Sequence, residues 1–357
     1  LTKMSDNRKE AEEKMAKAIF ISADCWLSVY DLLPPSQLGL GIALISHRFD
    51  FYVDEHFKTR KWALKYIEIR SKIGENGTKE MDIVNCNGER MPIPEIQIPR
   101  KVIGFKCIEI NFIDQNVIAF FRRFGPLSAT FPIHLIINTN TDRILEFFLR
   151  SIWPMIGKNI CGMDLFSSVF QSLRELVPSI LNDCPSLHYA NFNFYNLFAE
   201  FPADDSAMAS DGQWVAKWLF TPHPNNVPKM FPCWLDNDDG NWPSRITAFK
   251  AAFANASSPA NFIVVIRFIQ SPFADSVVPF DQTNEFTREQ LALKRTVLDE
   301  CFLLVRCPIA RDESKWTKWE KEAIGFRIDD QWNRIEIQMD DNYMEDEGAS
   351  RRNSWPM

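Results

Sequence analysis

The stretch 133–166, IHLIINTNTDRILEFFLRSIWPMIGKNICGMDLF, sets two short apolar segments on either side of a helical pattern. Both end segments are short and apolar enough to form buried strands, and 142–152 has apolar residues at the spacing of one helix face. Similar segments, KCIEINF and LHYANFN, begin at residues 106 and 187, so four strand-like segments start 27 residues apart. This alternation of strands and helices predicts an α/β fold.

The fixed period of these segments is typical of strand–helix solenoids of the leucine-rich-repeat type. Helical patterns at 117–124 and 167–181 fill the other gaps, and each unit can bury its apolar face only against a neighbour. The run LNDCPSL at 181–187 resembles the junction before a strand in cysteine-containing leucine-rich repeats. We therefore expect an irregular strand–helix repeat domain over 61–339. The alternative is an ordinary α/β domain whose crossovers happen to match in length.

The alternation continues beyond residue 200 with longer spacing. Strands are expected over 230–235, 262–268 and 301–307, and helices over 213–220, 243–255 and 287–295. Before the repeat, we expect a strand over 65–69 and a hairpin of strands 81–84 and 95–98, because Asn87 and Gly88 mark a turn. A second hairpin is expected over 324–339.

Residues 18–60 have helical patterns and predict a small three-helix domain. The first helix has apolar residues at i, i+3, i+4 and i+7, which are Trp26, Val29, Tyr30 and Leu33. Ser22 precedes this helix and can accept hydrogen bonds from its free N–H groups. A second helix is expected over about 36–46. Phe49, Val53 and Phe57 mark the third.

The same segment resembles an F-box. In that family an opening Leu-Pro and an acidic residue precede an apolar helix ending in Leu-Pro, and a Ser-basic-basic-aromatic signature follows a second helix. Here Ile21 and Asp24 occupy the opening positions, Leu33 and Pro34 end the helix, and ISHRF at 45–49 matches the closing signature. The resemblance covers about 40 of the 357 residues. More widely, the chain resembles nematode multigene families that join such a head to an α/β domain.

The resemblance implies a function, because F-box proteins bind Skp1 and through it a cullin ubiquitin ligase. The chain would be a substrate-recognition adaptor whose repeat domain binds a client protein. Residues expected to contact a Skp1-like partner, or to form the core behind that contact, are Ile21, Ser22, Leu27, Leu33, Pro34, Leu38, Ile45 and Phe49. Ser22 stands where the family has proline, and Asp31 is an acid within the expected helix. These departures favour a second interpretation, a repeat scaffold whose degenerate F-box does not bind Skp1.

No motif of an enzyme or metal centre stands out in the sequence. The five histidines form no metal-binding spacing, and we expect His134 and His188 to be buried or half-buried in strands. The acidic run 236–240 is out of register for a calcium loop and predicts a solvated turn. Trp316 and Trp319 are expected on an amphipathic packing helix. We therefore predict a binding protein that is not an enzyme, with no cofactor and no metal. A pocket lined by His, Asp or Cys at the strand ends would favour an unrecognised enzyme.

Composition and charge narrow the partners and the compartment. A net charge of −7 argues against a dedicated nucleic-acid binder. Eight scattered cysteines without a C-x-x-C pair, and no visible signal peptide, predict reduced thiols in the cytoplasm or nucleus. Apolar runs are too short to cross a membrane. Residues 1–17 are expected to be a charged tail and 340–357 a disordered acidic tail.

Overall fold

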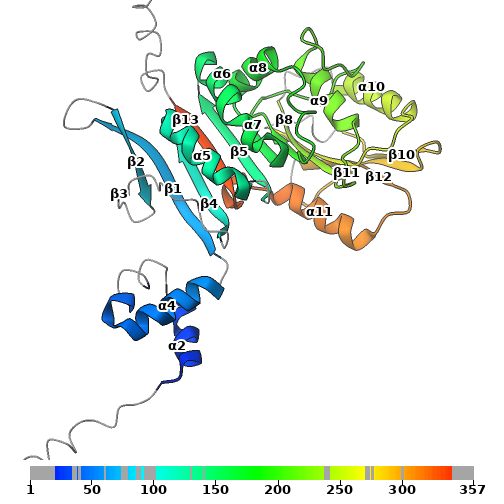
Figure 1. Cartoon of the computed structure of the whole chain (residues 1–357). Helices are drawn as coiled ribbons and strands as arrows, with labels where there is room; N and C mark the ends of the chain where they lie inside the picture. The colour runs from blue at the N-terminus through cyan, green and yellow to red at the C-terminus, as the bar shows by residue number, and fades with distance from the viewer. Residues whose placement is uncertain are drawn as a thin grey trace, which may run out of the picture. The chain divides into compact units, whose positions relative to one another are not determined.

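The computed structural model divides the chain into two compact units, Leu1–Trp62 and Ala63–Met357 (Figure 1). It describes residues 21–33, 38, 42–59, 62–73, 79–85, 90–91, 102–128, 131–139, 141–236, 242–269, 274, 277–298 and 301–339. The expected tails, 1–17 and 340–357, lie outside these residues. The two units are called here the helical unit and the sheet unit.

The helical unit contains α2 (Ala23–Tyr30), the 3-10 turn η2 (Ala43–Ile45) and α4 (His47–Thr59). Helix α2 begins where expected, because the Ser22 hydroxyl accepts a hydrogen bond from the Cys25 N–H at 3.4 Å. The first and third expected helices are present as α2 and α4, but α2 ends at Tyr30, before Leu33 that was expected on it. Of the second, 36–46, the structure describes residues 38 and 42–46, which include the 3-10 turn η2.

A small core holds the helical unit together. Tyr30, Leu38 and Val53 are fully buried in it, and Trp26 meets Phe49 edge-on with ring centroids 4.8 Å apart. This contact joins α2 to α4. Asp31 is the C-cap residue of α2, so the acid noted in the sequence lies at the helix end and not inside the helix.

The sheet unit is a mixed α/β structure around one large mixed sheet. The described residues form thirteen strands in the order β10-β11-β12-β9-β8-β7-β6-β5-β13-β4-β1-β2-β3. Their bounds are β1 Trp62–Ile73, β2 Lys79–Asn85, β3 Arg90–Met91, β4 Val102–Ile110, β5 Ile133–Thr139, β6 Ile160–Leu165, β7 Tyr189–Asn191, β8 Lys229–Leu235, β9 Phe262–Phe268, β10 Phe280–Asn284, β11 Glu289–Arg295, β12 Cys301–Pro308 and β13 Arg334–Met339.

The central strands are parallel and the strands near both ends are antiparallel. Strands β5 to β9 follow one another in the sheet in chain order, all parallel. The last strand, β13, lies between β4 and β5 and is parallel to both. Strands β12, β11 and β10 extend one end antiparallel, and β1 pairs antiparallel with β2 near the other.

Most helices of the sheet unit cover one face of the sheet. They are α5 Gln115–Ser128, α6 Asp142–Ser151, α7 Trp153–Ile156, α8 Ser167–Leu176, α9 Asp211–Phe220 and α10 Trp242–Ala254, with the 3-10 turn η3 Gly157–Asn159. Their buried side chains share one core with alternate residues of the strands, such as Leu135 on β5 and Met163 on β6. A strand–helix–strand stretch thus buries its apolar residues as the sequence predicts.

Helix α11 (Glu313–Gly325) lies on the opposite side of the sheet from α6, α8 and α10 (Figure 1). Trp316 and Ala323 on α11 pack with Met230, Ile263 and Val265 of β8 and β9 in a second core. The 3-10 turn η5 (Ile328–Asp330) adds Ile328. Trp316 and Trp319 are therefore on a packing helix, as expected.

Two expected elements are wrong. Residues 287–295 were expected as a helix, but Glu289–Arg295 is strand β11, because Leu291 and Leu293 alternate into the core while the strand pairs with β12. Residues 324–339 do not form a hairpin, because Ile324 belongs to α11, which ends at Gly325, and Arg334–Met339 is the inserted parallel strand β13. The expected strand 95–98 lies outside the described residues.

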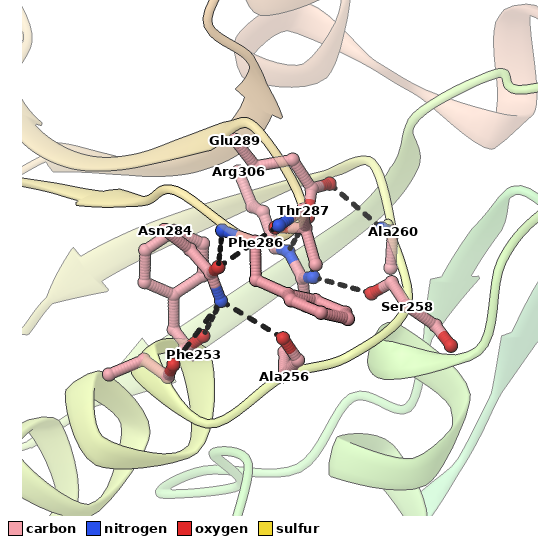
Figure 2. A network of polar contacts seen from close by, with 10 residues as sticks. Phe253, Ala256, Ser258, Ala260, Asn284, Phe286, Thr287, Glu289 and Arg306 are labelled. Carbon is pink, nitrogen blue, oxygen red and sulfur yellow. Dashed lines mark hydrogen bonds and ion pairs between the residues drawn. The ribbon is translucent and has the colours of Figure 1, made fainter.

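A buried polar network supports the antiparallel end of the sheet (Figure 2). The Arg306 guanidinium pairs with the Glu289 carboxylate at 2.6 Å and also donates to the Ser258 carbonyl at 2.8 Å. The other Glu289 oxygen accepts the Ala260 N–H at 2.8 Å. Beside the pair, the Asn284 amide donates to the carbonyls of Phe253 and Ala256. These bonds join β11 and β12 to the loop after α10, and β10 to the end of that helix.

Candidate protein-interaction site

The structure separates the residues expected at a Skp1 contact into core and surface. Leu38 is 1% exposed, and Leu27, Leu33 and Phe49 are half-buried against the same core. Ser22 caps α2, whereas Ile21 and Ile45 are exposed. Pro34 lies outside the described residues. Of the described residues in the named set, Ile21 and Ile45 are therefore the exposed apolar side chains.

Among the described residues of the helical unit, sequence reasoning named Ile21 and Ile45 for the contact but missed Leu32 and Phe51. It placed Val29 on the apolar face of the first helix, but Val29 is exposed. Leu32 is 84% exposed, Ile45 62% and Phe51 59%, and Val29 is also exposed. Leu32 lies two residues after the buried Tyr30, and Phe51 lies two residues after the half-buried Phe49. Residues two apart on a helix do not share a face, so this offset is the signal that could have found Phe51. Leu32 lies beyond Asp31, the C-cap of α2, where helical spacing no longer applies. We call Ile21, Val29, Leu32, Ile45 and Phe51 the exposed apolar set.

A second candidate surface lies on the sheet, on the face that carries α11. Strand registers place Glu109, Glu336, Ile136, Asp164 and Asn191 side by side on β4, β13, β5, β6 and β7. Ile136 packs at the margin of the core under α11, which fixes the face that this row occupies. We call these five residues the polar row. The sequence shows each of them inside an apolar segment, but it does not reveal that they align.

Asp164, like Glu109, is a half-buried carboxylate of the polar row, whereas Glu336 is buried. Asp164 accepts hydrogen bonds from the Asn191 amide at 2.9 Å and from the Asn193 amide at 2.6 Å. Burial raises the pKa of Asp164, the two amides oppose that shift, and Asp329 adds to it. Asn193 has a φ of 43°, a left-handed backbone conformation that asparagine tolerates better than most residues. The turn after β7 thereby brings its amide back to Asp164.

The other two carboxylates of the row differ in their partners. Glu336 pairs with the Arg334 guanidinium at 2.7 Å and accepts from the Cys107 thiol at 3.2 Å. Burial and the Glu336 charge raise the pKa of Cys107 to about 12, so this thiol stays protonated. Glu109 accepts from the Tyr66 hydroxyl and, at 3.2 Å, from the Asn111 amide.

The described histidines of the sheet unit are buried or half-buried. His134 is buried, its Nε2 lies 3.4 Å from the Cys161 sulfur, and its Nδ1 has no hydrogen-bond partner among the described residues. A Cβ at position 162 would collide with this ring, which explains Gly162. Burial lowers the pKa of His134 to about 4, so the ring is neutral near pH 7. His188 is half-buried, and burial lowers its pKa too.

Metal-binding geometry and membrane spans were also sought in the described part of the chain. No group of three His, Cys, Asp or Glu side chains there is placed to hold a metal ion. No described helix combines the length and apolarity needed to cross a membrane. Seven of the cysteines are described, all with free thiols, and Cys25 is the exposed one among them. In the acidic run 236–240, Asp236 binds the Asn196 amide at 2.8 Å, and the remainder lies outside the described residues.

Comparison with known proteins adds no relative to this geometry. No protein-family model matches the chain, and no curated protein or solved structure is significantly similar to it.

Proposed function

We propose that this protein is a substrate-recognition adaptor of a Skp1–cullin–F-box type ubiquitin ligase. In this proposal the helical unit binds a Skp1-like protein and the sheet unit binds a client protein. The chain itself carries out no chemistry, because the recruited ligase transfers ubiquitin. The observation that carries the proposal is the exposed apolar set on a helical unit whose own core is already filled by Tyr30, Leu38 and Val53.

The exposed apolar set is unusual for so small a unit. Burying one large apolar side chain contributes roughly 1.5–3 kcal/mol, so Leu32, Ile45 and Phe51 together could supply several kcal/mol of binding free energy. A partner groove that accepts apolar side chains from helices is a common mode of recognition. The resemblance of 21–49 to an F-box favours Skp1 as the owner of that groove.

The sheet unit suits the client-binding part of this proposal. We interpret β5 to β9 with their helices as a strand–helix repeat, supported by their placement in chain order. In such repeats the sheet face away from the helices is the usual binding surface. Strand β13, inserted between β4 and β5, is a departure from a regular repeat.

The decisive experiment is a titration of the full chain with purified Skp1 by isothermal calorimetry. Leu32→Asp and Phe51→Asp place charges on side chains that the core does not use. Both variants should fold normally and weaken binding at least tenfold. Val297→Asp is the matched control, because Val297 is fully exposed in the sheet unit. Leu38→Asp is unsuitable as a binding probe, since it would place a charge in the core.

Submicromolar binding that Leu32→Asp and Phe51→Asp weaken and Val297→Asp does not would support the adaptor. No binding by a folded wild-type chain would overturn it and leave the alternative, a protein-interaction scaffold with a degenerate F-box. Equal binding by all variants would also contradict the proposal as stated, because the exposed apolar set would not form the contact.

A further inference from the structure

The three carboxylates of the polar row differ in whether a cationic side chain pairs with them. Arg334 neutralises Glu336, but the described donors to Glu109 and Asp164 are a hydroxyl and amides. Among the described residues, neither of these two carboxylates has a cationic side chain as a hydrogen-bond or ion-pair partner. Because Asp164 is half-buried, bringing a cation to it would offset the desolvation that raises its pKa.

The distance between these two carboxylates determines how far apart two cations of a bound peptide would lie. Glu109 and Asp164 stand in register, three strand intervals apart, on β4 and β6 with β13 and β5 between them. Strands lie about 4.8 Å apart and an extended chain rises about 3.4 Å per residue, so the roughly 14 Å between them spans about four residues. Ile136, between Glu336 and Asp164, offers an apolar contact to the methylene stem of a lysine.

Amides border the polar row on the side of the carboxyl ends of the strands. Asn138 and Gln338 stand directly opposite each other on β5 and β13, and both are exposed. Asn193 is exposed beside Asp164. An amide side chain can donate and accept at once, so these three can pair with the N–H and C=O groups of a peptide crossing the strands.

We propose that the polar row is the client-binding surface and that its ligand is an extended basic segment with two lysines or arginines about four residues apart. The segment lies across the strands from β4 to β7, with one cation on Glu109 and the other on Asp164. The charges of the row and the exposed amides beside it favour this occupant over an acidic segment or a nucleic acid. This inference rests on the proposed function, because it names the chemistry of the client.

The test measures binding of labelled peptides to the full chain by fluorescence anisotropy. Capped peptides of serine and threonine carry two lysines four positions apart, two positions apart, or both replaced by norleucine. The first peptide should bind on the order of tenfold more tightly than the second. It can form one more charge-assisted hydrogen bond, and the loss of one such bond weakens binding by about that factor. The norleucine peptide should not bind. Binding should weaken at high salt, because the surface charges are then screened.

Variants locate the contact on the sheet. Asp164→Asn and Glu109→Gln keep the shape of each side chain and should each weaken binding about tenfold. Glu146→Gln is the matched control, since Glu146 is exposed on α6, on the other side of the sheet. Peptide binding that ignores lysine spacing, or that Asp164→Asn and Glu109→Gln leave unchanged, would overturn the inference.

The same samples are titrated with Skp1, which separates the two proposals. Absent peptide binding with intact Skp1 binding would overturn the basic-segment inference and leave the adaptor standing. If the chain binds the peptide but not Skp1, the adaptor proposal would be overturned. The basic-segment site would then belong to a protein-interaction scaffold.

Discussion

The helical unit and the sheet unit differ in which polar and apolar side chains they bury. In the described residues, the helical unit fully buries Tyr30, Leu38 and Val53 and leaves five large apolar side chains in water. The sheet unit has a core on each face of its sheet and also buries an ion pair, Arg306 with Glu289. Burying two charges carries a desolvation cost, and the apolar burial of a large core can offset it.

This difference indicates how each unit meets a partner. A unit with a small core has little stability to spare, and its exposed apolar side chains gain most from being covered by another protein. A unit with a large core can hold carboxylates at fixed spacing on a rigid sheet, which suits selective recognition of charge. The proposed division between Skp1 docking and client selection follows from these two kinds of surface.

The largest expected effect comes from breaking the buried ion pair. Arg306→Ala leaves the Glu289 carboxylate buried without a cation and should lower the free energy of unfolding of the sheet unit by about 3–5 kcal/mol. Urea denaturation followed by tryptophan fluorescence measures it. Arg327→Ala is the control, because Arg327 and its partner Asp330 are both largely exposed. The control should leave the denaturation midpoint unchanged.

A double variant sharpens this result. Replacing Arg306 by Met and Glu289 by Leu removes both charges and should recover most of the loss, since apolar replacements of buried pairs are often neutral or stabilising. A single Arg306→Ala variant as stable as the wild type would show that the sheet unit does not depend on the pair.

Local patterns were sufficient to predict much of this fold. The strand–helix–strand stretch 133–166 folds as expected, because Ile133, Leu135 and Ile137 alternate into the core and the helix after them is amphipathic. Strand β11 was mistaken for a helix because Glu, Gln, Leu, Ala and Lys are good helix formers. Pairing with β12 overrides that preference, and its period-two burial is visible only once the partner strand is known.

Long-range pairing was the part that local patterns could not reveal. Strand β13 has the alternating residues Ile335, Ile337 and Met339 that mark a strand, but its neighbours β4 and β5 are some two hundred residues earlier in the chain. The polar row depends on that insertion, because Glu336 on β13 lies between Glu109 on β4 and Ile136 on β5. Helical spacing gave the apolar anchors of the helical unit, but core and surface could be separated only by packing, as Leu38 and Ile45 illustrate.

Acid should weaken the sheet unit next most strongly. The pKa of His134 is about 4 in the folded chain against 6.5 for an ordinary histidine, because of burial first and the nearby His188 and Arg334 next. The unfolded chain therefore binds more protons in this range, and stability present above pH 6.5 is lost as the pH falls toward 4. The loss should be on the order of 3 kcal/mol.

His134→Gln should remove this contribution, so that the difference in unfolding free energy between wild type and variant depends on pH between 6.5 and 4. Urea denaturation at a series of pH values measures it. His47→Gln, at an exposed residue of the helical unit, is the control and should leave the pH dependence of the sheet unit unaltered. A difference that stays constant over this range would contradict the buried, neutral state of His134.

The smallest expected effect compares one helix cap in each unit. Ser210 forms a capping box on α9, accepting from the Gln213 N–H at 3.1 Å while the Gln213 side chain accepts from the Ser210 N–H at 2.9 Å. Ser22 accepts one longer bond from the Cys25 N–H at 3.4 Å, donates to the Cys25 sulfur at 3.2 Å, and is exposed. Ser210→Ala should cost about 1–2 kcal/mol and Ser22→Ala about 0.5 kcal/mol. Hydrogen exchange over 211–220 and over 23–30 reports each helix separately.

Gln213→Ala removes half of the capping box, and its cost in stability should fall between those of Ser210→Ala and Ser22→Ala. A larger effect at Ser22 than at Ser210 would mean that the helical unit depends on its cap more than on its core, contrary to the packing of Tyr30, Leu38 and Val53.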